Sequence, residues 1–232
     1  MINRYYLNEI PVDFGPRTDV WRTVNDWLFS GEKPRQVVTL NAVMLTTALT
    51  QSRLKRVIQR ADLVTVDGYG IMMALQRRGI WTESFPGVEL AGQLMDYCIQ
   101  KKLPVYCLGG TKGTVLGLRQ IYGEYGSVFF RDGFSENQDL IREEIIKLEP
   151  KLILAGLGSP RQEYFLAELL PKLTATVGIG VGGALEIISG QKPRAPKFLI
   201  NNGGEWCYRM LQDPKKLKLL PELVKFWHLF LR

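Results

Sequence analysis

The sequence is poor in the side chains that most often bind metal ions or act as nucleophiles. Its 232 residues include one histidine, His228, close to the C-terminus. That scarcity argues against Ser-His-Asp and Cys-His mechanisms and against histidine-ligated metal sites. The three cysteines, Cys98, Cys107 and Cys207, form no Cys-x-x-Cys pair. Such cysteines argue against a disulfide framework or a structural zinc site and are typical of a reducing cytoplasm.

Long hydrophobic runs are also missing. No stretch of about 18 uncharged apolar residues occurs, so we expect no simple transmembrane helix. The N-terminal segment has no apolar region of the kind that marks a signal peptide. The sequence also lacks an Asp-x-Asp pair, a common ligand of metal–diphosphate complexes. We therefore expect no metal site and no cofactor.

Positive charge is present in excess and is concentrated at one end. The formal net charge is +7, and residues 192–232 contain nine basic and three acidic residues, which leaves +1 for residues 1–191. This asymmetry predicts an anionic partner for the C-terminal segment, such as lipid headgroups, nucleic acid or a phosphorylated ligand. We expect an α/β domain over 1–191 and a basic helical appendage over 192–232.

Short apolar runs rich in β-branched residues alternate with helical periodicity along the first part of the chain. Strands are expected at 36–40, 62–66, 104–108, 128–131, 151–155 and 176–179. Helices are expected at 42–60, 69–79, 89–101, 114–123, 138–148, 161–170 and 184–189. Alternation of this kind predicts an α/β fold with a mainly parallel, Rossmann-like sheet and flanking helices.

Polar residues and glycines follow several of these strands. In open α/β sheets, ligands bind beyond the carboxyl ends of the strands. Glycine turns let backbone amides approach a phosphate, although a tight strand–helix connection is the simpler explanation for any one of them. None is a Walker loop or a full Gly-x-Gly-x-x-Gly motif. The candidate ligand-binding residues are Gly68, Gly109, Gly110, Thr111, Gly156, Gly158, Gly182 and Gly183.

A carboxylate is the best candidate for proton transfer in a chain with so little histidine. Asp67 ends the second expected strand and is followed by a glycine. An aspartate has an ordinary pKa of about 3.9, so a base that works near neutral pH needs burial or a neighbouring charge to raise it. The alternative is that Asp67 caps the next helix or braces a turn.

Several sequence runs together resemble the bacterial WecG/TagA/CpsF family, glycosyltransferase family 26. The matching runs are TLNA (39–42), ADLVTVDG (61–68), PGVEL (86–90), LGGTKG (108–113), DGF (132–134), LAGLGSPRQE (154–163), GIGVGGALEIISG (178–190), RAP (194–196) and EWCYRMLQDP (205–214). They cover most of the chain in the expected order. The GLGSPRQE run, followed by RAP and Glu-Trp-x-Tyr-Arg, is the most specific part of the match.

The resemblance implies a metal-independent, inverting transfer from a UDP-sugar to a polyprenyl-diphosphate-linked sugar, in the synthesis of teichoic acid or another surface polysaccharide. N-acetylmannosamine, N-acetylmannosaminuronic acid and glucose are the sugars that family members transfer. The family's catalytic threonine, asparagine and aspartate fall on Thr39, Asn41 and Asp67, with Asp67 as the general base. Its Pro-x-Gln-Glu motif places Gln162 and Glu163 among the expected substrate contacts.

The chain departs from the usual family pattern at a few positions. Ser84 replaces an arginine and Glu89 replaces an aspartate in the run before the third expected helix, and Leu185–Glu186 stands where Phe-Asp is frequent. A double arginine after the Glu-Trp-x-Tyr-Arg segment is absent, with lysines nearby instead. These departures concern the identity of donor and acceptor, not the class of enzyme.

The C-terminal segment supplies the remaining expected contacts. Arg194 and Arg209 are candidates to stabilise the charge of the departing diphosphate. A helix over 218–232 would carry an apolar stripe beside recurring basic residues, a pattern typical of helices that lie on a membrane surface. The stripe consists of Leu220, Leu223, Val224, Trp227 and Leu231. We expect residues 192–232 to dock on the anionic inner face of the plasma membrane. Packing of the stripe on the body, or on a second copy in a homo-oligomer, is the alternative.

Two readings from other classes remain open at this level. A nicotinamide-dependent oxidoreductase would use the glycine turns for its cofactor, with Asp67 on the ribose. An RNA-binding module would use the basic tail, although its aromatic residues fall on an apolar stripe and not on a basic face. The family resemblance opposes both, so we expect no nucleic-acid partner.

Overall fold

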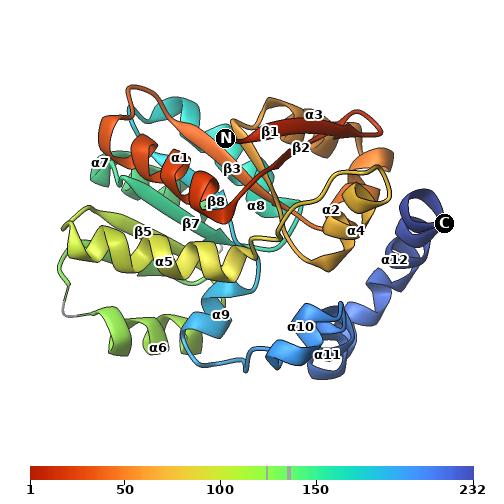
Figure 1. Cartoon of the computed structure of the whole chain (residues 1–232). Helices are drawn as coiled ribbons and strands as arrows, with labels where there is room; N and C mark the ends of the chain where they lie inside the picture. Colours follow the sequence, from red (N-terminus) through yellow and green to blue (C-terminus); the bar gives the residue numbers. More distant parts are fainter. Residues whose placement is uncertain (124, 135–136) are drawn as a thin grey trace.

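The computed structural model describes residues 1–123, 125–134 and 137–232, apart from the side chains of Ser30, Asn201, Arg209 and Lys215 (Figure 1). Eight strands form one sheet in the order β1-β2-β4-β3-β8-β7-β5-β6. The β1–β2 pair is antiparallel, and the other pairings are parallel. The strands are β1 (Asn3–Leu7), β2 (Ile10–Phe14), β3 (Arg35–Leu40), β4 (Leu63–Val66), β5 (Val105–Gly109), β6 (Val128–Arg131), β7 (Leu152–Gly156) and β8 (Val177–Gly180).

Helices cover both faces of this sheet, and the central strands accordingly bury most of their residues in three apolar clusters. One face packs against α1 (Arg17–Ser30), α5 (Gly87–Gln100), α6 (Lys112–Tyr122) and α9 (Ala184–Ile188). The other face packs against α2 (Ala42–Thr50), α3 (Ser52–Arg60), α4 (Tyr69–Gln76), α7 (Gln138–Leu148) and α8 (Arg161–Leu169). The predicted α/β class with a mainly parallel sheet is confirmed.

The helix expected over 42–60 is in fact two helices that meet at Gln51. Gln51 has extended backbone angles, φ −111° and ψ 95°, and links the end of α2 to the start of α3. Threonine hydroxyls in α2 bond to backbone carbonyls, as Thr50 does to Thr47 at 3.0 Å. Such bonds compete with helical ones and favour a helix end here.

The N-terminal hairpin and α1 were not among the elements expected from the sequence. The hairpin is attached to β4 by a buried charge, because the Asp13 carboxylate accepts hydrogen bonds from Arg4 at 2.6 and 2.7 Å and from the Val64 amide at 2.7 Å. Asp13 is 4% exposed, so these three bonds replace the water that the carboxylate loses.

The chain leaves β3 and β8 toward opposite faces of the sheet. α2 follows β3 on one face and α9 follows β8 on the other, while β3 and β8 are themselves paired neighbours. In α/β sheets such a point opens a crevice at the carboxyl ends of the two strands. This geometry places the candidate site at that edge.

The C-terminal appendage runs from this edge and returns to the body (Figure 1). After α9 it forms α10 (Lys197–Asn201), α11 (Glu205–Gln212), a 3₁₀ turn (Pro214–Leu219), α12 (Leu220–Phe226) and a π-helical turn (Trp227–Leu231). Phe226 and Phe230 are buried in the cluster that contains α2 and α4. A Cβ on Gly70 would lie 3.1 Å from the Ala42 side chain and 3.4 Å from the Phe226 ring, so α2, α4 and this ring pack closely around Gly70. Among the described residues, no helix has the length and apolar character that a bilayer crossing requires.

Candidate active site at the carboxyl edge of the sheet

The end of β3 supplies two of the expected catalytic side chains, and each already has a structural partner. Thr39 is buried and donates its hydroxyl to the carbonyl oxygen of Gly180 at 2.7 Å, which ties β3 to the end of β8. Asn41 begins α2, and its side-chain oxygen accepts a hydrogen bond from the Met44 amide at 3.0 Å. This bond uses the amide oxygen of Asn41, so any substrate contact would come from its NH₂ group.

Asp67, the expected base, lies at the end of β4 next to the start of α5. Its side chain is half-buried, and one carboxylate oxygen accepts a hydrogen bond from the Gly87 amide at 3.2 Å. A Cβ on Gly87 would lie 3.3 Å from the Thr39 side chain, so Gly87 sits against Thr39 as well. The structure therefore brings Asp67 and Thr39 together around one glycine.

Gly68 and Ser84 close the loop above β4. The Gly68 amide donates to the Ser84 hydroxyl oxygen at 2.8 Å, and Gly68 has a φ of 86°, which glycine adopts without strain. Ser84 occupies the position where related sequences usually have arginine, and here its side chain holds the loop. The Gly68 amide, expected from the sequence to contact the ligand, is thus already occupied.

The turn after β5 is shaped by close packing. A Cβ on Gly109 would lie 2.5 Å from the carbonyl oxygen of Gly156, because β5 and β7 converge at this edge. Gly110 has a φ of 66°, and Thr111 begins α6 in a reciprocal capping arrangement with Thr114. These contacts explain the glycines structurally, and their binding role stays a prediction.

The turns after β7 and β8 are linked by two buried side chains. Gly182 lies in the β8 turn and donates its amide to Gln162 at 2.9 Å, and Gln162 donates in turn to Glu163 at 2.7 Å. Gln162 is 2% exposed and Glu163 is 1% exposed, so neither reaches the surface. Gly158 and Gly183 lie on the same edge. Burial raises the pKa of the Glu163 carboxyl, although hydrogen bonds from Gln162 and Ser159 oppose that shift.

The appendage delivers Arg194 to this edge. Arg194 pairs with Glu89 in the first turn of α5, two residues from Gly87. Arg17 of α1 bonds the other oxygen of Glu89 at 2.8 Å. Arg17 was not expected from the sequence, since nothing in the N-terminal segment predicted where α1 would pack. The side chain of Arg209 lies outside the described part of the structure.

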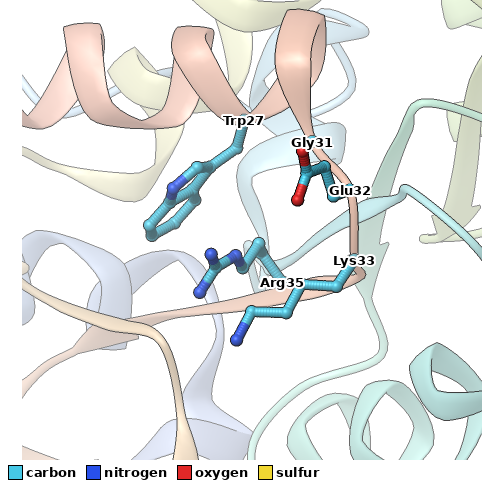
Figure 2. Close-up of a pocket in the computed structure, with 5 residues that line it drawn as sticks. All are labelled: Trp27, Gly31, Glu32, Lys33 and Arg35. Carbon is cyan, nitrogen blue, oxygen red and sulfur yellow. The ribbon is translucent and has the colours of Figure 1, made fainter.

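Two hollows on the described surface lie at different edges of the sheet. A cavity of about 390 Å³ lies at the amino end of β3 between Trp27, Lys33 and Arg35 (Figure 2). Figure 2 shows the Arg35 guanidinium facing the Trp27 ring, 5.1 Å from its centroid, and Arg35 also pairs with Asp62. A much smaller hollow lies at the carboxyl edge between Gly183 and the first residues of the appendage. The larger cavity therefore lies away from Asp67.

The arrangement can hold an anion and accept a proton. A half-exposed carboxylate, two arginines around one glutamate and several glycine turns lie at the same edge of the sheet. Within the described residues, no group of three or more histidine, cysteine, aspartate or glutamate side chains is placed to hold a metal ion.

Comparison with known proteins extends the sequence resemblance. The model of the glycosyl transferase WecG/TagA/CpsF family matches residues 5–232. A protein of Bacillus spizizenii named N-acetylglucosaminyldiphosphoundecaprenol N-acetyl-beta-D-mannosaminyltransferase is 28% identical over 195 residues, 82% of this chain and 76% of that protein. A protein of the same name from Staphylococcus aureus (strain MW2) is 29% identical over 197 residues, which are 83% of this chain and 78% of that protein.

The cap formed by Asn41 can be tested by its effect on stability. We expect Asn41→Ala to lower the free energy of unfolding by about 1 kcal/mol, because the Met44 amide loses its acceptor. Asn41→Asp should restore most of that loss, since a carboxylate also accepts this bond. Urea denaturation measures both. Asn137→Ala is the matched control, because Asn137 caps α7 in the same way at 3.1 Å and lies outside the candidate site. An Asn41→Ala protein as stable as the wild type would contradict this assignment.

Proposed function

Since the chain belongs to the glycosyl transferase WecG/TagA/CpsF family, we propose that it transfers a sugar from a UDP-sugar to a polyprenyl-diphosphate-linked sugar, with inversion at the anomeric carbon. The observation that carries the proposal is the grouping of Asp67, Thr39 and Arg194 at the crevice end of the sheet. The names of the relatives favour N-acetylmannosamine as the sugar and N-acetylglucosaminyl-diphosphoundecaprenol as the acceptor.

Asp67 is proposed as the base. In this role it removes the proton of the acceptor hydroxyl as that oxygen bonds to the anomeric carbon. The bond from the anomeric carbon to the diphosphate oxygen breaks in the same step, and UDP leaves with the electron pair. General base catalysis of this kind contributes on the order of 10²–10⁴-fold to the rate.

The departing diphosphate needs compensating positive charge. Arg194 pairs with Glu89, and Arg17 pairs with both Glu89 and the exposed Glu83, the latter at 3.7 Å, so the charges of these four side chains balance. Guanidinium groups bind diphosphate oxygens through paired hydrogen bonds, and the pair at α5 lies close to Asp67. We propose that Arg194 contacts the diphosphate and that the glycine turns contribute backbone amides.

The appendage is proposed to hold the enzyme on the membrane, where a polyprenyl acceptor resides. Phe226 and Phe230 are buried against the body, and other apolar side chains of the segment are exposed, whereas Leu223 and Leu231 of the predicted stripe are half-buried. The exposed ones are Leu217, Leu220, Val224, Trp227 and Leu229. Lys218, Lys225 and Arg232 accompany them, and each basic residue near an anionic leaflet adds about 1 kcal/mol to binding. A second copy of the chain is the alternative occupant of this face.

The base is tested by Asp67→Asn, which keeps an oxygen for the Gly87 amide but cannot accept a proton. We expect transfer to fall by about 10²–10⁴-fold while the dissociation constant of UDP changes little. Transfer to a short-chain diphosphate-lipid acceptor and calorimetric UDP titration measure the two effects. Transfer by Asp67→Asn at the wild-type rate would remove Asp67 from this role.

Independence from metal is a separate expectation. Because the sequence lacks an Asp-x-Asp pair, we propose that arginine and backbone amides, not a metal ion, stabilise the leaving diphosphate. Transfer should therefore proceed at an unchanged rate in excess EDTA. An absolute requirement for Mg²⁺ or Mn²⁺ would contradict it.

The membrane face is tested by Val224→Ser combined with Trp227→Ser, since both side chains are 60% exposed. In the docked state both side chains would be buried in the bilayer, and burying each one contributes about 1.5–3 kcal/mol. Removing them should therefore weaken binding to vesicles containing anionic phospholipid by more than tenfold. Vesicle sedimentation measures binding. Trp81→Ser is the control, as Trp81 is 79% exposed and lies outside the appendage. Equal pelleting of the variant and the wild type would refute docking. Sedimentation velocity without lipid would identify a dimer face instead.

A further inference from the structure

We infer that Gln162 and Glu163 are positioning residues that fix the turn after β8 against the Asp67 side of the site. This inference deepens the transfer proposed above and rests on it. Both side chains start in the first turn of α8, yet both point toward the carboxyl end of β8. At most 2% of the surface of either residue is exposed, so substrate cannot contact them directly in this arrangement.

The two side chains form a one-way hydrogen-bond chain. The Glu163 oxygen accepts from the NH₂ group of Gln162 at 2.7 Å, and this leaves the amide oxygen of Gln162 to accept from the Gly182 amide at 2.9 Å. A Gln162 amide rotated by half a turn would turn its NH₂ group toward the Gly182 N–H, so the observed orientation uses the Glu163 oxygen as acceptor on one side and the Gly182 amide as donor on the other. The effect of Glu163 on the site therefore passes through Gln162.

Glycine at position 180 makes room for this pair. A Cβ on Gly180 would lie 2.7 Å from the Gln162 amide nitrogen and 2.9 Å from the Glu163 oxygen. The Gly180 carbonyl in turn accepts the Thr39 hydroxyl at 2.7 Å. Since Gly87 packs on Thr39 and bonds Asp67, contacts run without a gap from Glu163 to the proposed base.

The surroundings of Glu163 favour its neutral form. One of its carboxylate oxygens is fully buried and has no hydrogen-bond partner, a costly situation for an ionised group. The groups that face the carboxyl are neutral: Gln162 of its own helix, Ser159 of the preceding turn and Gly180 of β8. In the described part of the chain, none of the groups that shift the pKa of Glu163 is a basic side chain. The carbonyl oxygen of a neutral Glu163 accepts the hydrogen bond from the Gln162 NH₂ group, as the amide oxygen of a glutamine at position 163 would.

Glu163→Gln and Glu163→Ala separate this role from others. Glu163→Gln keeps the acceptor for Gln162, and we expect its kcat/KM for the donor to stay within about threefold of the wild type. Glu163→Ala frees the Gln162 amide, and a turn displaced by about 1 Å is expected to cost on the order of 10²-fold in kcat/KM for the donor. The KM for the acceptor should change less than about twofold, since the β8 turn is proposed to serve the donor diphosphate.

Leu169→Ala is the matched control. Leu169 is fully buried on the same helix, but it packs in the apolar cluster of α7 and α8 and takes no part in the hydrogen bonds of Gln162 and Glu163. All rates are measured where each variant is fully folded. A loss in Leu169→Ala as large as in Glu163→Ala would overturn the inference, because general loosening of α8 would then explain both. Wild-type activity in Glu163→Ala, or an equal loss in Glu163→Gln, would overturn it too.

A stability measurement tests the same pair without relying on catalysis. Because burial raises the pKa of Glu163 in the folded state, the folded state holds this proton more tightly than the unfolded chain does. Wild-type stability should therefore fall as the pH rises from the unfolded-state pKa of Glu163 to its folded-state pKa. Glu163→Gln lacks this loss. The Tm of Glu163→Gln minus that of the wild type should therefore grow by at least about 2 °C between about pH 5 and pH 8.

A Tm difference that stays constant, or that shrinks as the pH rises, would show that folding does not raise the pKa of Glu163 and would overturn the neutral-acid assignment. The two failures are distinguishable. If wild-type protein transfers no sugar, the proposed function fails while the Tm comparison still reports on Glu163. If wild-type protein transfers sugar and Glu163→Ala matches it, only the positioning role fails.

Discussion

The contact of Gly87 with both Asp67 and Thr39 holds the candidate site together. The Gly87 amide bonds the carboxylate, and the missing side chain lets the backbone rest on the threonine. This fixes the start of α5 beside the ends of β3 and β4. Because Glu89 lies in the same turn of α5, the two arginines that it binds are placed from the same point. The Asp67 carboxylate and the two arginines are thus positioned by the same turn of α5.

Much of this arrangement follows from the sequence, and the part that does not has a physical reason. Strands β4, β5, β7 and β8 are buried almost throughout, so their apolar runs are easy to recognise in the sequence. The hairpin β1–β2 depends on Asp13 meeting Arg4 and a distant amide on β4, and no local pattern reports such a contact. In the appendage, helical periodicity predicts an apolar stripe, but which side faces the body depends on the packing of Phe226 and Phe230 against α2 and α4.

The site residues divide in the same way. Asp67, Thr39 and the glycine turns could be expected at one edge because parallel strands end together. Their hydrogen-bond partners could not. Ser84 occupies the Gly68 amide and Gln162 occupies the Gly182 amide, so two groups that look available in the sequence are already bonded. Arg17 comes from a helix whose position only the tertiary structure reveals.

The seat of Phe226 on Gly70 has an evolutionary consequence. A Cβ at position 70 would already touch that ring at 3.4 Å and crowd the Ala42 side chain at 3.1 Å, so a side chain larger than alanine would enter the space that the ring occupies. A homologue with a bulkier residue there can keep the same fit only with a smaller residue at position 226. We therefore expect these two positions, more than 150 residues apart in the chain, to covary among homologues.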